Sequence, residues 1–142
     1  MESLRSVDRD AQSFTALMKA YRLPKETDSD RQIRSEEIQM RLKYAAQVPL
    51  ETAELAAHTV HAARKLSEYA NVSALSDIRT AIFLAQAGLQ GAGANVATNL
   101  TGIKETEYRK KTEQKLNELQ NQVEKNTSEA LRVLTTRSRN SA

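Results

Sequence analysis

The sequence predicts an all-α fold, a multihelical antiparallel bundle of about five helices. Apolar residues recur at intervals of three and four along most of the chain, which is the period of one helix face. Among 142 residues there are only 4 Gly and 2 Pro, and aromatic residues make up 4%. This composition is poor in the turn and strand residues on which β domains depend, and the length fits about one domain.

A first helix is expected from about Leu4 to Arg22. Its apolar stripe consists of Leu4, Val7, Ala11, Phe14, Met18 and Tyr21. We expect it to end at Pro24, because the residue before a proline avoids the helical conformation. The segment Thr27–Asp30 then offers side-chain oxygens and carboxylates that suit the start of a second helix.

Pro49 leaves two possibilities open. It either kinks the second helix or occupies the first position of a third one, which continues to about Tyr69. A fourth helix follows, and a last one spans roughly residues 105–134. The polar residues 135–142 are expected to fray, so the helical domain is predicted to cover residues 1–134.

The predicted fourth helix is unusual because Thr80–Ile103 contains no charged residue. Its amide and hydroxyl side chains are too costly in hydrocarbon for a membrane span. It also carries all the glycines of the protein, Gly88, Gly91, Gly93 and Gly102. Since glycine in a helix interior costs up to about 1 kcal/mol relative to alanine, this clustering needs a reason. Two explanations stay open: a close contact with another helix or subunit through Gly88, Gly91 and Gly93, or a polar ligand site lined by Asp77, Asn95 and Asn99.

The overall charge excludes a dedicated nucleic-acid binder. The net charge is +3, with 21 Lys and Arg mixed among 18 Asp and Glu. There is no Cys, and the first residues lack the apolar core of an export signal, so a cytoplasmic protein is expected. His58 and His61 lie one turn apart beside Glu54, but the chain has no other His, and we expect no metal site.

Two carboxylates of the first helix are candidates for chemistry. Asp8 and Asp10 lie on opposite edges of its apolar stripe, and Asp10 is expected to be the more inward of the two. A helix-start carboxylate that favours the macrodipole is one interpretation. An acid–base group is the other.

Five ordered segments resemble a single family. They are Val7–Phe14 with Tyr21–Lys25, Val48–Leu50, Leu75–Asp77, Gly91–Val96 and Asn99–Leu100. Each segment is short, but together and in this order, over residues 4–119, they resemble the cyclodeaminase domain of formiminotransferase-cyclodeaminase and the related methenyltetrahydrofolate cyclohydrolases. The transferase domain is absent, and so is a Pro-Gly-Gly-Gly-Ser segment that family domains usually carry earlier. The chain therefore resembles the C-terminal two-thirds of the family domain.

The resemblance implies a metal-free, dimer-forming enzyme of folate one-carbon metabolism and histidine degradation. The family's deaminase is an ammonia lyase that closes 5-formiminotetrahydrofolate to 5,10-methenyltetrahydrofolate. Its substrate is a tetrahydrofolate derivative, and no nucleic acid or membrane takes part. A cyclohydrolase acting on 5,10-methenyltetrahydrofolate, or a non-catalytic helical oligomerisation module, are the alternatives.

The resemblance also implies roles for particular residues. The acid–base candidates that match family carboxylates are Asp8, Asp10 and Asp77. Asn95 and Asn99 match the family's polar pair and would orient the substrate. From their charge alone, Arg22 and Lys25 could meet the anionic glutamate tail of a folate.

Overall fold

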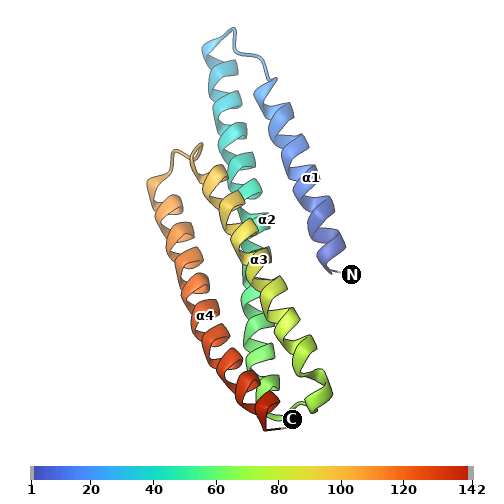
Figure 1. Cartoon of the computed structure of the whole chain (residues 1–142). Coiled ribbons are helices and arrows are strands. Elements are labelled where there is room, and N and C mark those ends of the chain that lie inside the picture. Colours follow the sequence, from blue (N-terminus) through green and yellow to red (C-terminus); the bar gives the residue numbers. More distant parts are fainter. Residues whose placement is uncertain (1, 141–142) are drawn as a thin grey trace. The chain divides into compact units, whose positions relative to one another are not determined.

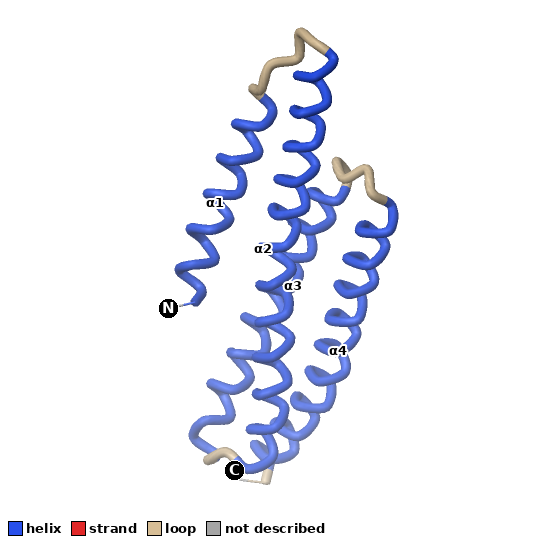
Figure 2. Tube along the Cα trace, turned by 180° about the vertical axis from the view of Figure 1, so that it is seen from behind, coloured by secondary structure: helices blue, strands red, loops and turns tan. Residues whose placement is uncertain are grey.

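The computed structural model describes residues 2–140 of the chain, with side chains from residue 8 onward. In this part it contains helices and loops and no strand (Figure 1 and Figure 2). The elements are α1 (Glu2–Tyr21), α2 (Asp28–Tyr69), the 3₁₀ turn η1 (Val72–Ala74), α3 (Leu75–Leu100) and α4 (Thr106–Arg139). The all-α prediction is confirmed, but the described residues form four α-helices and not about five. The side chains of Leu4 and Val7 in the predicted stripe lie outside the described part.

The chain divides into two compact units. The first contains residues 2–51 and 92–113, and the second contains residues 52–91 and 114–140. Helices α2, α3 and α4 each contribute to both units. None of the helices described is long and apolar enough to cross a membrane.

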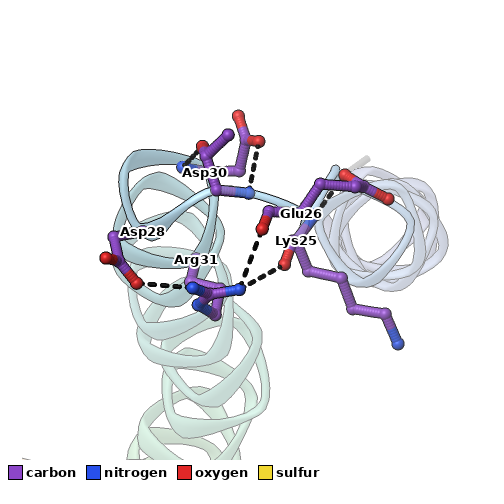
Figure 3. A network of polar contacts seen from close by, with 6 residues as sticks. Lys25, Glu26, Asp28, Asp30 and Arg31 are labelled. Carbon is purple, nitrogen blue, oxygen red and sulfur yellow. Dashed lines mark hydrogen bonds and ion pairs between the residues drawn. The ribbon is translucent and has the colours of Figure 1, made fainter.

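Helix α2 begins with a reciprocal capping box, as the sequence predicts. The Thr27 hydroxyl oxygen accepts the backbone N–H of Asp30 at 3.0 Å, and an Asp30 carboxylate oxygen accepts the N–H of Thr27 at 3.1 Å. Hydrogen bonds from the Thr27 side chain and backbone hold the pKa of Asp30 below its ordinary value. The Arg31 guanidinium donates to the carbonyls of Lys25 and Glu26 at 3.0 Å and so fastens the preceding loop to α2 (Figure 3).

Pro49 lies inside α2 and does not separate two helices, which is why the predicted count is wrong. A proline has no N–H, so the carbonyl of Ala45, four residues earlier, loses its normal helix partner. The side-chain amide of Asn99 donates to this carbonyl at 3.0 Å. Because Ala46 and Val48 are also buried, packing and this substitute bond keep α2 continuous.

The loop between α3 and α4 is held by the side chain of Gln39. Its amide N–H donates to the carbonyl of Gly102 at 3.0 Å, and its oxygen accepts the N–H of Lys104 at 2.7 Å. A Cβ added at Gly102 would lie 2.9 Å from a methyl group of Leu42. Glycine therefore allows the close approach of this loop to α2 in the first unit.

An ion pair links α1 to α2 within the first unit. Arg9 donates to Glu51 at 2.5 Å and lies over the ring of Tyr44, 6.0 Å from its centroid. The hydrogen bond from Arg9 is the main cause that lowers the pKa of Glu51 below its ordinary value. The same bond raises the pKa of Arg9.

This pair should give stability an acid-sensitive component. Because the pKa of Glu51 is depressed on folding, the contribution is full above about pH 4.5 and is lost as the pH falls through the folded-state pKa. Glu51→Gln should lower the thermal midpoint near neutral pH, and its difference from wild type should shrink in acid. Thermal unfolding followed by circular dichroism measures this, with the exposed Glu36→Gln as control. A difference that stays constant through the acid range would contradict it.

The second unit is built on a cluster of buried apolar side chains from α2, α3 and α4. The cluster consists of Ala63, Leu75, Ile78, Ile82, Ala130 and Leu134. Arg137 donates to the carbonyls of Ser67 and Ala70 at 2.8 and 2.6 Å. It thereby caps the C-terminal end of α2, where carbonyls lack helix partners.

Helix α4 extends beyond the predicted end of the domain. It runs to Arg139, so residues 135–139 of the predicted frayed tail are helical here, and Ser141 and Ala142 lie outside the described residues. The Ser138 hydroxyl donates to the carbonyl of Leu134, which is fully buried. Fraying of this end in solution stays a prediction.

Candidate functional site

A small cavity of about 290 Å³ lies within the first unit between α1, α2 and α3. Its lining residues are Asp10, Ser13, Phe14, Leu17, Ala45, Asn95, Thr98 and Asn99. The floor is apolar, because Leu17 and Ala45 are buried. The cavity thus combines a carboxylate and two amides with an apolar base, as small-molecule sites commonly do.

The helices place these groups by simple spacing. Asp10, Ser13 and Leu17 lie at intervals of three and four on α1, so they share one face. Asn95 and Asn99 are one turn apart on α3, with Thr98 beside them. The cavity is therefore the place where the inner face of α1 meets the last turns of α3.

Most hydroxyl and amide hydrogens of the lining are already used within the protein. The Ser13 hydroxyl donates to the carbonyl of Asp10 at 2.8 Å, and the Thr98 hydroxyl donates to Ala94 at 3.0 Å. The Asn99 amide donates to the carbonyls of Ala45 and Asn95 at 3.0 and 3.1 Å. What these three side chains offer a ligand is their oxygen lone pairs.

Three of the site residues expected from the sequence come together here. Asp10, Asn95 and Asn99 line the same cavity, although 85 residues separate the first two in the chain (95 minus 10). Asp10 is exposed at its rim, and Asn99 is half-buried.

The other expected residues are not part of this lining. Asp8 is exposed on α1, and Asp77 is exposed in the first turn of α3, in the second unit. Arg22 and Lys25 are exposed just after α1. In Figure 3 the Lys25 side chain extends away from the polar network at the start of α2.

Within the described chain, Gly88 and Gly91 make no close contact with another helix, and the predicted contact with another subunit stays a prediction. A Cβ added at Gly88 or at Gly91 would meet no heavy atom within 4 Å. Gly93 is buried in the first unit. A close approach at a glycine is found at Gly102, where an added Cβ would lie 2.9 Å from a methyl group of Leu42 and that side chain would have to shift.

Sequence reasoning missed Ser13, Thr98 and the buried Ala45 as parts of the cavity. The spacing of Ser13 from Asp10 could have indicated the first of these, since three residues along a helix return to the same face. Nothing local marks Ala45, whose role depends on Pro49 and on a residue of another helix.

Two further cavities have a different character. One of about 790 Å³ lies between α1 and α2 and is mainly apolar, with Lys19 and the Glu37–Arg41 ion pair at its edge. Another, of about 560 Å³, lies in the second unit beside His58 and His61. Across the described residues, no group of three or more His, Cys, Asp or Glu side chains is arranged to hold a metal ion.

The fold and the cavity define a class of protein: an all-helical protein with a small cavity that combines an acid with amide groups. The comparisons give the family. The model of the formiminotransferase-cyclodeaminase family matches residues 1–118. The chain therefore belongs to the formiminotransferase-cyclodeaminase family.

Individual relatives agree with this assignment. The chain is 35% identical over 111 residues to a methenyltetrahydrofolate cyclohydrolase of Methylorubrum extorquens, covering 78% of this chain and 52% of that protein. It is 34% identical over 113 residues to the formimidoyltransferase-cyclodeaminase of Mus musculus, covering 80% of this chain and 21% of that protein.

A solved structure extends the likeness to the fold. The crystal structure of a formiminotetrahydrofolate cyclodeaminase from Thermotoga maritima superposes with a TM-score of 0.80 at 28% identity. The match covers 93% of this chain and 62% of that one. The chain thus spans about half or less of the two curated relatives named above and under two-thirds of this structural neighbour.

Proposed function

We propose that this chain carries a folate site of the cyclodeaminase type, in which Asp10 is the acid–base group. The observation that supports this proposal is the meeting of Asp10 with Asn95 and Asn99 in one cavity. With a volume of about 290 Å³, the cavity suits one end of a folate and not the whole molecule.

The reaction requires two proton movements. The formimino group reacts in its protonated form, and N10 of 5-formiminotetrahydrofolate attacks its carbon. N10 then loses its proton, and the former imino nitrogen, now an NH2 group, takes up one proton and departs as ammonia, which leaves the cationic methenyl bridge. A carboxylate near both nitrogens can accept the first proton and return it to the leaving nitrogen. The position of Asp10 in the lining of this cavity, beside the buried Leu17 and Ala45, supports this role.

The remaining assignments follow the same proposal. Asn95 and Asn99 orient the reacting end of the folate, and Arg22 and Lys25 are candidates to meet the anionic glutamate tail. Asp8 and Asp77 stay alternative acid–base candidates. A cytoplasmic location and a place in histidine degradation belong to the same proposal.

The test is direct incubation of the chain with 5-formiminotetrahydrofolate. Growth of methenyl absorbance together with released ammonia is the expected result. Binding without turnover would retain the folate site and reject the activity for this chain. If neither binding nor turnover occurs, the proposed function is wrong.

A cyclohydrolase is the second candidate, favoured by the name of the Methylorubrum relative. It would add water to 5,10-methenyltetrahydrofolate, so methenyl absorbance would fall and no ammonia would appear. The two reactions are therefore distinguished by the same pair of measurements.

We also propose that the exposed face of α3 in the second unit pairs with a second copy of the chain. Phe83 and Leu84 are 51% and 68% exposed there, and Gly88 and Gly91 leave open space beside them. No charged residue from position 80 to 103 opposes burial of this face. If the chain is a non-catalytic helical oligomerisation module, this face of α3 is its interaction surface.

Gly91→Leu should weaken this assembly, because a bulky side chain would hold the two helices apart. Light scattering should report a dimer for wild type and a shift towards monomer for the variant. Ala62→Leu, an exposed small residue on α2, is the matched control and should leave the dimer intact. A monomeric wild type, or a variant that assembles normally, would count against the proposal.

A further inference from the structure

The side chain of Asn99 performs a task that α2 cannot perform for itself. The Ala45 carbonyl would normally accept the N–H of residue 49, which is proline. Asn99 supplies this bond from α3, 54 residues away in the chain. Its second amide hydrogen goes to the carbonyl of Asn95, one turn earlier on its own helix.

These two bonds fix which atom of Asn99 is available to a ligand. A side-chain amide has two hydrogens to donate, and both are used. The group that remains is the oxygen Oδ1, which can only accept. The missing N–H of Pro49 therefore determines the orientation of a side chain in another helix.

The hydroxyl groups and the carboxylate of the cavity lining also present hydrogen-bond acceptors. The hydroxyl hydrogens of Ser13 and Thr98 are given to backbone carbonyls of their own helices. An ionised Asp10 carboxylate contributes acceptors and a negative charge. Apart from Asn95, the polar side chains of this cavity thus present acceptors, and a group rich in N–H donors, neutral or cationic, complements them.

We propose that Asn99, held by the carbonyl that Pro49 leaves free, selects a folate carrying an N–H-bearing formimino group over one carrying a closed methenyl ring. This inference rests on the proposed folate site. A formimino group is an amidine, which carries N–H donors and takes a positive charge on protonation. The methenyl carbon bridges N5 and N10 in a cation, but neither nitrogen keeps a hydrogen. The methenyl compound therefore shares the positive charge but offers the Asn99 oxygen no N–H donor.

The positioning bond is tested without any folate by a double-mutant cycle. Asn99→Ala removes the bonds to the carbonyls of Ala45 and Asn95, and loss of the Ala45 bond by itself should increase the unfolded fraction about fivefold in the wild-type background. In the Pro49→Ala background the increase should be smaller, because the backbone N–H restored at position 49 can then serve the Ala45 carbonyl. Asn126→Ala is the matched control, since Asn126 also donates to a backbone carbonyl one turn earlier but lies in α4 of the second unit. Its effect should be equal in both backgrounds.

The selectivity is tested by titrating each protein with 5-formiminotetrahydrofolate and with 5,10-methenyltetrahydrofolate. Wild type should prefer the formimino compound, and Asn99→Ala should reduce this preference about tenfold, the loss of a hydrogen bond to a charged group. The double variant Pro49→Ala with Asn99→Ala should regain the stability that Asn99→Ala loses, but not the preference for the formimino compound. If Asn99 had only a structural role, the preference would return together with the stability.

The outcomes separate this inference from the proposed function. Binding of both folates with a preference that Asn99→Ala leaves unchanged would overturn the selection by Asn99 and leave the folate site standing. Binding of neither would overturn both. Equal costs of Asn99→Ala in the two backgrounds would overturn the role assigned to Pro49, whatever the folates do.

Discussion

Replacing Asp10 by asparagine should lower the rate of methenyltetrahydrofolate formation about 100- to 10,000-fold, the range typical of a lost acid–base group. Asparagine keeps the size of the side chain but can neither take the N10 proton nor return it to the leaving nitrogen. Because Asp10 lies exposed at the rim of its cavity, the substitution should leave folding intact. Initial rates and the thermal midpoint together measure the two effects.

Variants of three other carboxylates serve as controls for this prediction. Asp28→Asn, at a carboxylate that is 98% exposed at the start of α2, should retain the wild-type rate within about twofold. Asp8→Asn and Asp77→Asn test the two carboxylates that the cavity does not include. If either abolishes turnover while Asp10→Asn retains it, the assignment to Asp10 is wrong.

The second large effect concerns the core of the second unit. Ile82 is fully buried in a cluster with Ile78, Leu134 and their neighbours. Ile82→Ala should lower the free energy of unfolding by about 2–5 kcal/mol, because it removes buried apolar surface and leaves a cavity. Urea unfolding followed by circular dichroism measures this loss.

Leu66→Ala provides the matched control in the same unit. Leu66 is 43% exposed on α2, so truncating it removes less buried surface and should cost less than about 1 kcal/mol. Equal losses for the two variants would mean that Ile82 does not occupy a packed core.

The local features of the fold could be predicted well from the sequence. The start of α2 follows from Thr27 and Asp30, whose side chains bond to backbone groups three residues away. The end of α1 follows from Pro24, before which the chain leaves the helical conformation. Such features depend on residues that are close together in the chain, so they can be predicted from the local sequence.

Burial on α2 was harder to predict, because the apolar residues of its first half lie on more than one face. Ile33, Met40 and Val48 recur at intervals of seven and eight residues, which places them near one face of the helix. The structure buries Val48 but leaves Ile33 and Met40 each 57% exposed, while Leu42 and Ala45 face the interior. Periodicity identifies a helix, but it does not decide which of two apolar faces the other helices cover.

The helix pattern and the family resemblance both indicate Asp8, Asp10, Asp77, Asn95 and Asn99 as site candidates. Asp10, Asn95 and Asn99 line one cavity, whereas Asp8 and Asp77 lie outside that lining. The functional role of these residues stays a prediction. A motif specifies residue types and their spacing along the chain. Whether a residue lines a cavity depends on how the helices pack against one another in three dimensions.

The sequence by itself determined the helical nature of this protein, the start of α2 and the family to which it belongs, because each is encoded in contacts or patterns that are short along the chain. The tertiary structure alone decided that Pro49 lies within one continuous helix, and that Asn99 bonds the carbonyl of Ala45. Both depend on the meeting of α2 with α3, through a contact between residues 54 positions apart. A pattern of a few neighbouring residues cannot specify such a contact, because it forms only when both helices are packed.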